Sequence, residues 1–370
     1  MSELFIGLMS GTSLDGVDGV LVDLSVDPLQ VLAYASAPLS QALTDELLAL
    51  NIPGTNELHR AALAANALVR VYAHVVSQLL SESGTAAADV IAIGAHGQTV
   101  RHQPQGFDGT GYTLQLNNPA LLAELTGIDV VADFRSRDVA AGGQGAPLVP
   151  AFHQAVFGRP GETRAALNIG GISNLTILGP HSDEVLGFDC GPGNALMDAW
   201  CRQHTGQPFD SDGAWAAAGR IHSGLLADLL DEPYFDQPAP KSTGRDLFNA
   251  NWLARKLEKF SSVSSVDVQA TLTELTASVC SGAMLRYGLA SKNLIVCGGG
   301  AFNTYLMARL QAQLPVLQVS SSQDHGLPPP QVEAAAFAWM ARRTLLGMTS
   351  SLKEVTGAKG ARILGSIYPT

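Results

Sequence analysis

The sequence predicts an α/β protein built from two lobes, and three features of the chain support this. Its 370 residues exceed what one ordinary hydrophobic core accommodates. Strand-like apolar runs alternate with helix-like segments, which is typical of a mainly parallel sheet. Two segments, one at the start and one near residue 163, each read as an apolar run, a small-residue turn and a second apolar run. These hairpin-led halves indicate an internally duplicated protein.

The first half opens with a predicted β-hairpin, formed by FIGLMSG and VDGVLVDL. The residues between them are rich in Gly, Ser and Asp, which favour turns. A third strand, LQVLAYASAPL, follows, and residues 56–83 have the apolar spacing of a helix. VIAIGAHGQT is predicted to be a short buried strand that runs into a polar loop. LLAELTGIDVVADF repeats the order of helix, then strand.

The second half repeats the hairpin in TRAALNIGGISNLTILGP and EVLGFDCGPGN. VQATLTELTASVCSGAMLRYGL is predicted to be an amphipathic helix, NLIVCGGGAFN a buried strand that meets a glycine turn, and VEAAAFAWMARRTLL a helix. Residues 232–248 are predicted to form a long surface loop, and such loops often carry function.

Composition narrows the class of protein. A net charge of −11 argues against a nucleic-acid or anionic-membrane partner. There is no Lys or Arg before Arg60 and no run of about 18 apolar residues, so neither a secretory signal nor a membrane span is expected. The cysteines lack CxxC spacing and are expected to be reduced. We therefore expect a cytoplasmic globular protein. The four cysteines are Cys190, Cys201, Cys280 and Cys297.

The first chemical motif is SGTSLDGVD, which ends at Asp18. Gly11 and Gly16 allow a backbone to approach an anion, and Thr12 and Ser13 add hydroxyl donors. Asp15 or Asp18 could hold water on a magnesium ion. Taken alone, such a loop is more simply explained as a hairpin turn, and the GK(S/T) ending of a Walker A motif is absent.

Three further glycine motifs follow. NIGGISN is either a tight hairpin or a second phosphate loop with backbone donors at Gly170 and Gly171. In FDCGPGN, Asp189 ends an apolar strand beside glycine amides, where catalytic groups often lie in α/β sheets, although a helix N-cap explains the same residue. The three glycines of CGGGAFN permit close approach of an adenine ring or a ribose phosphate.

Two polar clusters, AHGQTVRH and DFRSRDVAAGGQGAPLVP, suit a hydroxylated ligand. His96 and His102 lack the i, i+4 spacing of a helical zinc site. Gln98, Thr99 and Arg101 are candidate ligand contacts. A structural ion-pair network explains Arg135, Arg137 and Asp138 equally well. Glu333 opens the late helix, where it also suits the helix dipole.

In their order along the chain, these motifs match the acetate and sugar kinase, heat-shock chaperone and actin superfamily. Within it, GLMSGTSLDGVD, HGQTVRH, DFRSRDVAAGGQGAPLVP, LNIGGISN, FDCGPGN and VCGGGAFN resemble the anhydro-N-acetylmuramic acid kinase family over nearly the whole chain. The resemblance implies a two-lobed, ribonuclease H-like ATPase fold of the actin and hexokinase type, with mixed sheets, flanking helices and an interlobe cleft. Residues 1–145 and 336–370 would form lobe I, and 146–335 lobe II.

The resemblance also implies an activity: ATP- and Mg²⁺-dependent phosphorylation of 1,6-anhydro-N-acetylmuramic acid, with water opening the anhydro bridge, in cell-wall recycling. It assigns the catalytic base to Asp189, and the family is usually dimeric. The nucleotide contacts expected are Gly11, Thr12, Ser13, Leu14, Asp15, Gly16, Val17, Asp18, Asn168, Gly170, Gly171, Gly191, Gly193, Asn194, Gly298, Gly299, Gly300 and Asn303. The sugar contacts expected are His96, Gln98, Thr99, Arg135, Asp138 and Glu333; the metal ligands stay open.

Two other functions remain open on the residues alone. A kinase of an ordinary N-acetylhexosamine would use the same Asp189 to deprotonate a free hydroxyl. A chaperone-like ATPase would need a peptide-binding module, and no appended domain is evident. A dinucleotide-binding enzyme is disfavoured because no G-x-G-x-x-G follows the first strand.

Overall fold

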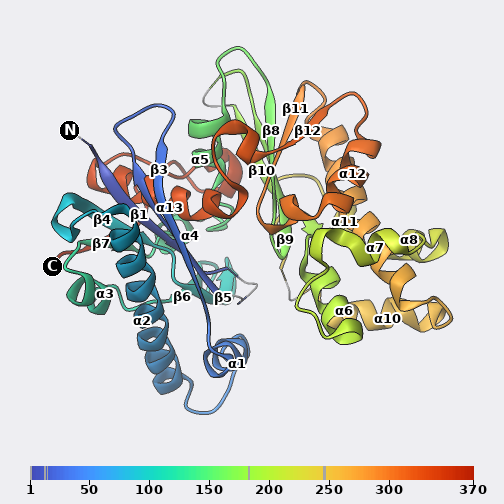
Figure 1. Ribbon diagram of the computed structural model, residues 1–370, viewed down its shortest axis with the longest axis horizontal. Coiled ribbons are helices and arrows are strands. Elements are labelled where there is room, and N and C mark those ends of the chain that lie inside the picture. The colour runs from blue at the N-terminus through green and yellow to red at the C-terminus, as the bar shows by residue number, and fades with distance from the viewer. Residues whose placement is uncertain (1, 12–13, 15, 182–183, 245–246) are drawn as a thin grey trace. The chain divides into compact units, whose positions relative to one another are not determined.

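The computed structural model describes residues 2–11, 14, 16–181, 184–244 and 247–370 (Figure 1). The chain divides into two compact units: unit 1 is Met1–Phe152 with Pro330–Thr370, and unit 2 is His153–Pro329. The boundaries predicted from the sequence, 145/146 and 335/336, lie seven and six residues from these.

Unit 1 is built on a six-stranded sheet in the order β13-β7-β4-β1-β2-β3. Strands β1, β2 and β3 are antiparallel neighbours, β4 and β7 run parallel to β1, and β13 closes one edge. A separate hairpin, β5–β6, follows β4. The strands of unit 1 are β1 Leu4–Met9, β2 Gly16–Asp23, β3 Gln30–Pro38, β4 Val90–Ala95, β5 Gln98–Pro104, β6 Gly111–Leu116, β7 Val130–Ala132 and β13 Ser366–Tyr368. Its helices are α1 Gln41–Ala49, α2 Glu57–Ser83, η1 Ala87–Asp89, α3 Pro119–Thr126, α4 Ser136–Ala140, α13 Val332–Leu345 and α14 Lys353–Thr356, and α5 Pro150–Phe157 spans the first boundary between the units.

Unit 2 repeats this arrangement in a five-stranded sheet ordered β10-β9-β8-β11-β12. Strands β8, β9 and β10 are antiparallel neighbours, and β11 and β12 run parallel to β8. The strands of unit 2 are β8 Arg164–Ile169, β9 Ile172–Leu178, β10 Val185–Pro192, β11 Asn293–Cys297 and β12 Gln318–Ser321. Its helices are α6 Ala195–Thr205, η2 Ser211–Gly213, α7 Ala214–Ala218, α8 Ser223–Leu230, α9 Pro233–Asp236, α10 Ala250–Leu257, η3 Glu258–Phe260, α11 Ser265–Tyr287, η4 Gly299–Phe302, α12 Thr304–Gln313 and η5 Ser322–His325, and η6 Pro329–Gln331 spans the second boundary.

The shared strand order shows the two-fold repetition that the paired hairpins predicted. Each sheet joins three antiparallel strands to two that run parallel to the first. The α/β class with mixed sheets and flanking helices is therefore confirmed. The expectation of mainly parallel sheets was wrong, because the hairpins contribute antiparallel pairs to both.

Helices cover both faces of the unit 1 sheet, and their distance from the sheet differs between the two faces. Ile6 and Leu8 face the core beneath α2. Gly7, between them, faces α13, because side chains alternate along a strand. A Cβ at Gly7 would lie 1.8 Å from the carbonyl oxygen of Ala334, and one at Gly94 would lie 2.0 Å from that of Phe337. The backbone of α13 thus rests directly on β1 and β4.

Helix α2 is, among the described residues, the one helix long and apolar enough to cross a membrane. Its apolar side chains form the core over β2 and β3, with Leu68, Tyr72 and Val75 fully buried. Packing in a core accounts for the apolar composition of α2, so its length and composition are weak evidence for a membrane span.

Three elements differ from their predictions. AHGQTVRH is not a loop: residues 98–104 form β5, where residues alternate between more and less buried positions opposite β6. Residues 232–248 are not simply a surface loop, because they contain α9 and bury Tyr234 and Phe248 in the core. Helix α11 is not amphipathic but buried on nearly all sides. Polar residues suggested loops in the first two segments. In α11, several buried polar side chains, among them Thr273, Glu274 and Thr276, are hydrogen-bonded inside unit 2.

We predict that Gly94→Ala destabilises the protein by about 1–3 kcal/mol, because the added Cβ meets the backbone of α13 and not a flexible side chain. Urea unfolding followed by circular dichroism measures this change. Gly106→Ala is the control, since its Cβ meets nothing closer than 3.4 Å in the same unit. An unfolding free energy for Gly94→Ala equal to that of Gly106→Ala would contradict the prediction.

Candidate functional site

The three glycine motifs of unit 2 lie together at one end of its sheet. The turn between β8 and β9 supplies the carbonyls of Gly170 and Gly171, which accept the backbone N–H groups of Asn194 at 2.8 Å and Gly193 at 3.0 Å. The turn after β11 packs on the same place, because a Cβ at Gly300 would lie 2.4 Å from the side chain of Ile169. Residues 168–174, 189–194 and 297–303 therefore form one surface of backbone.

These glycines are required by the packing of one turn on another. A Cβ at Gly193 would lie 2.3 Å from the carbonyl oxygen of Gly170. Gly298 has a φ of +75°, and a Cβ there would lie 2.4 Å from Oδ1 of Asn168. In unit 1, a Cβ at Gly16 would lie 2.7 Å from the carbonyl oxygen of Ala37 on β3. Close approach of backbone to backbone therefore explains the motifs before any ligand is considered.

Asp189 lies within β10 and not at its end, which corrects the sequence prediction. The strand continues to Pro192 after a bulge between Asp189 and Gly191. The N-cap of α6 is Asn194, so Asp189 is not a helix cap. Bulges re-aim side chains and are frequent beside active sites.

A row of polar residues crosses the sheet at the level of Asp189. Cys297 pairs with Asn168, Asn168 with Asn174, and Asn174 with Asp189 in adjacent strands. Cross-strand partners share a face of the sheet. Oδ1 of Asn174 is buried and has no hydrogen-bond partner among the described residues. Sequence reasoning missed Asn174, although the symmetry of the hairpin about Gly171 places it opposite Asn168.

The backbone and the carboxylate of Asp189 are held by residues from the 232–248 segment. The amide of Asp189 donates to the carbonyl of Lys241 at 3.0 Å, and the Tyr234 hydroxyl donates to the carbonyl of Asp189 at 2.8 Å. The amide of Thr243 donates to Oδ2 of Asp189 at 3.0 Å. Burial, followed by the charge of Asp189, raises the pKa of Tyr234, which keeps its hydroxyl a donor.

The cysteines near these turns are core residues, as the sequence suggested. Cys297 is fully buried, and its thiol lies 3.7 Å from Oδ1 of Asn168. A hydrogen bond with Cys280, together with burial, raises the pKa of the Cys190 thiol. A thiol held protonated in this way is a poor nucleophile.

The first glycine loop, in unit 1, is described in part. Thr12, Ser13 and Asp15 lie outside the described residues. Leu14 has a φ of +59° and donates its amide to the carbonyl of Gly11 at 3.2 Å. The side chains of Leu14 and Val17 are buried, so only their backbone atoms are available to a ligand. Oδ1 of Asp18 accepts from the Tyr34 hydroxyl at 2.6 Å.

Two of the expected sugar contacts, His96 and Arg135, meet just after the end of β4. Nε2 of the buried His96 accepts from Nε of Arg135 at 3.0 Å. Burial and the charge of Arg135 hold the pKa of His96 well below its usual range, so the ring is neutral. The ring centroid of His96 lies 4.7 Å from that of Phe337. Glu333 stands one turn before Phe337 on the same side of α13.

The remaining expected contacts have different surroundings. Oε1 of Gln98 is buried without a partner among the described residues, whereas Oγ1 of Thr99 accepts from Gln115 at 3.3 Å. Asp138 is fully buried: Oδ2 accepts from the Gly145 amide and Oδ1 from the Thr356 hydroxyl, both at 2.8 Å.

Arg135 also reaches the loop that Asp138 holds. It donates to the carbonyl of Gly145 at 2.8 Å. Asp138 thus orders this loop from inside the unit. Arg101, in contrast, donates to the carbonyl of Leu50 and pairs with Glu57, which is a structural role.

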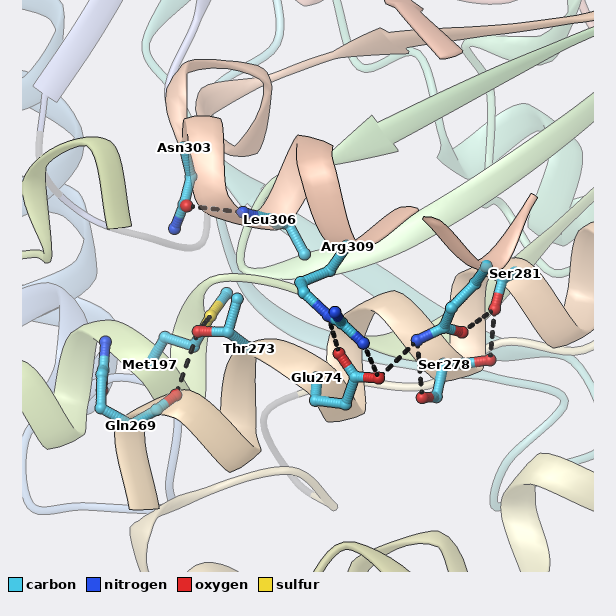
Figure 2. Close-up of polar contacts among 10 residues, drawn as sticks. Met197, Gln269, Thr273, Glu274, Ser278, Ser281, Asn303, Leu306 and Arg309 are labelled. Carbon is cyan, nitrogen blue, oxygen red and sulfur yellow. Dashed lines mark hydrogen bonds and ion pairs between the residues drawn. The ribbon is translucent and has the colours of Figure 1, made fainter. Parts of the chain in front are cut away.

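Figure 2 shows a polar network that holds α12 against α11. Glu274 is nearly buried and accepts two hydrogen bonds from Arg309, at 2.6 and 2.9 Å, and one from Gln313 at 2.8 Å. Asn303 caps α12 by accepting the amide of Leu306 at 2.9 Å. Because α12 directly follows the glycine turn 298–303, this network fixes the turn in place.

Comparison with known proteins gives one consistent family. The family model described as anhydro-N-acetylmuramic acid kinase matches residues 3–370. A protein of that name from Albidiferax ferrireducens is 74% identical and covers all of both chains. Another from Variovorax paradoxus is 65% identical over 99% of each chain.

Among solved structures, a reductive activator for a corrinoid, iron–sulfur protein is similar with a TM-score of 0.51 at 13% identity, covering 90% of this chain and 60% of that one. At this identity the likeness concerns the fold alone.

We expect the glycine turn 298–303 to contact ATP, and Glu274 anchors the helix that follows this turn. We therefore predict that Glu274→Ala weakens the binding of ATP about tenfold, or about 1.4 kcal/mol. Isothermal titration with a non-hydrolysable ATP analogue measures the change. Asp228→Ala is the control, since it removes an ion pair with Lys256 between other helices of unit 2. Equal affinities of the two variants would contradict the proposed anchoring.

Proposed function

This chain belongs to the anhydro-N-acetylmuramic acid kinase family, and we propose how its residues divide the work of that reaction. The protein is an ATP-dependent kinase that converts 1,6-anhydro-N-acetylmuramic acid to N-acetylmuramic acid 6-phosphate in the recycling of peptidoglycan. The observation that supports the residue assignments best is the position of Asp189 beside three converging glycine turns.

The substrate itself dictates two linked events. Its 1,6-bridge occupies the primary hydroxyl, so a phosphoryl group cannot simply be transferred to that oxygen. Water attacks the anomeric carbon, and the bond from that carbon to the bridging oxygen breaks. The released oxygen attacks the γ-phosphoryl group of ATP, and ADP leaves. The attacking water must also lose a proton.

Asp189 accepts that proton as general base. Its carboxylate is half-buried, and the Thr243 amide fixes its orientation at Oδ2. Asn174 lies directly across the strand pair, where its amide suits the orientation of a water molecule. A base held before the reaction requires little reorganisation when the bond forms.

The glycine turns bind the nucleotide. In unit 2 these are Asn168, Gly170, Gly171, Gly191, Gly193, Asn194, Gly298, Gly299, Gly300 and Asn303; in unit 1 they are Gly11, the undescribed Thr12, Ser13 and Asp15, and Leu14, Gly16, Val17 and Asp18. Leu14 and Val17 contribute through their backbones, because their side chains are buried.

Asp18 is the described residue best suited to Mg²⁺. No cluster of three potential ligands occurs among the described residues. This fits magnesium, which commonly takes one or two carboxylates together with phosphates and water. The ion would neutralise charge on the transferring phosphoryl group. Asp18 has the carboxylate that such a site needs, oriented by the Tyr34 hydroxyl.

The sugar is bound by polar side chains of unit 1. Arg135, Glu333 and Thr99 present charged and hydroxyl groups, and Gln98 has a buried oxygen that suits a sugar hydroxyl. Neutral His96 holds Arg135 in place. Asp138 does not need to contact the sugar, because it positions Gly145, whose carbonyl bonds Arg135.

The setting follows from the substrates. ATP and recycled cell-wall sugars meet in the cytoplasm, and we assign the protein to that compartment. We also propose a homodimer, on the resemblance to the family alone.

We predict that the purified protein with ATP, Mg²⁺ and the anhydro sugar in ¹⁸O-water yields a sugar phosphate that carries one solvent oxygen, as measured by mass spectrometry. Phosphorylation of a free-hydroxyl hexosamine, with no turnover of the anhydro sugar, would transfer the function to an ordinary sugar kinase. Loss of ATP without any acceptor product would favour the chaperone-like ATPase.

We predict that Asp189→Asn lowers kcat by roughly 10²–10⁴-fold, because the amide cannot accept the proton. Steady-state kinetics measure the loss, and circular dichroism checks the fold. Asp231→Asn, an exposed carboxylate at the end of α8, is the matched control and should retain full activity. Activity of Asp189→Asn within tenfold of wild type would exclude this base.

A further inference from the structure

At Asp189, the edge of the unit 2 sheet is covered by a bonded segment of the chain. Strand β10 is an edge strand, and an edge leaves backbone donors and acceptors that need partners. At Asp189 both groups are bonded by the segment Tyr234–Thr243, through the carbonyl of Lys241 and the hydroxyl of Tyr234. The same segment bonds the carboxylate through the Thr243 amide. Three of its residues therefore converge on one residue of the strand.

The ammonium group of Lys241 joins the two ends of the segment Tyr234–Thr243 by hydrogen bonds. Its Nζ donates to the carbonyls of Tyr234 at 2.9 Å and of Phe235 at 3.0 Å, and lies 4.4 Å from the centroid of the Tyr234 ring. These carbonyls lie in α9, and that of Tyr234 also accepts the amide of Gln237 at 3.2 Å. The ammonium group therefore adds a charged donor at the end of a short helix, where cations are favourable. Lys241 thus bonds the start of the segment with its side chain and Asp189 with its backbone.

Aromatic packing gives the segment a firm base. The rings of Phe235 and Phe248 stack at 5.5 Å, and Tyr234 is buried in the core. A Cβ at Gly191 would lie 2.7 Å from the ring of Phe235. The glycine after the bulge therefore lets this ring pack against the strand that carries Asp189.

We propose that Lys241 is a positioning residue for Asp189, which it holds through the segment Tyr234–Thr243. This inference rests on the proposed role of Asp189 as the base. Lys241 does not need to contact either substrate. Its bonds fix the segment, and the segment fixes the backbone and the carboxylate of Asp189.

Lys241 and Asp189 also interact through their charges. Burial lowers the pKa of Lys241, while the neighbouring Cys190, Asp236 and Asp189 oppose that effect and Arg286 adds to it. Tyr234 also faces Asp189. A carboxylate that loses a neighbouring cation binds its proton more readily. Removal of the Lys241 charge should therefore move the acid limb of the pH–rate profile to higher pH.

The test compares Lys241→Met with Lys241→Arg in the full-length protein. For Lys241→Met we expect kcat to fall about 10–100-fold, while KM for ATP and for the sugar stays within about threefold, because displaced catalytic geometry affects turnover and not binding. The acid limb should move to higher pH. Lys241→Arg keeps the charge and the donors, and should restore most of the turnover and the position of the acid limb.

Lys256→Met is the matched control. Lys256 also donates to two backbone carbonyls, those of Asp228 and Asp231, and lies over the Trp252 ring. Within the described part of the chain, none of these partners bonds Asp189. It should lower stability without changing the pH profile. Tyr234→Phe, which removes only the hydroxyl bonded to Asp189, provides a second test if Lys241→Met does not fold; a lower kcat with unchanged KM supports the inference.

The inference is overturned if Lys241→Met, or Tyr234→Phe in its place, turns over at the wild-type rate. An equal loss in Lys256→Met with no change of the acid limb also overturns it, because the effect is then only structural. These results leave the proposed function intact when wild type makes the sugar phosphate and Asp189→Asn does not. If Asp189→Asn stays active, the base itself is wrong and the inference falls with it.

Discussion

Backbone packed directly on backbone, at glycines, is the constraint on which both units depend. In unit 1 it brings α13 onto β1 and β4, at Gly7 and Gly94. In unit 2 it brings the turn at Gly193 against the carbonyl of Gly170. A side chain at any of these positions would meet main-chain atoms that cannot rotate away. The glycine motifs therefore hold the elements together first, and the surfaces that we propose for the nucleotide are a consequence of that packing.

The groups that we propose for catalysis in unit 2 lie on strands, where the sheet fixes their position. Asp189 and Asn174 are cross-strand partners, so the sheet itself sets their separation. Because Asp189 lies on an edge strand, its backbone amide and carbonyl need hydrogen-bond partners from outside the sheet. The segment Tyr234–Thr243 supplies both partners. A rigid sheet and a separate bonded segment together hold the carboxylate more firmly than either would alone.

Local pattern predicted most elements of the fold, because the apolar periodicity of both hairpins, α2 and α13 reflects burial directly. It also predicted the glycine turns, because runs of small residues between apolar strands favour turns. It placed Asp189 at the end of its strand, although β10 continues to Pro192. It failed where distant residues decide the outcome. The polar residues of β5 suggested a loop until β6 was placed opposite them. Glu274 was not singled out, and Asp138 was expected to contact a sugar or to join an ion-pair network. Arg309 bonds Glu274 and Thr356 bonds Asp138, and these partners lie 35 and 218 positions away in the chain.

Helix α11 is the clearest case of such long-range control. Its buried polar residues cost free energy unless each is bonded, and its bonds lead to the site from both sides. Oγ1 of Thr276 donates to the carbonyl of Gly193 at 3.0 Å, at the turn after Asp189. One half-turn earlier, Glu274 holds Arg309 of α12, behind the last glycine turn. A helix with an apolar surface makes packing contacts but no directional bonds. A polar one fits only where its partners are, so α11 sets the spacing between the two turns that it supports.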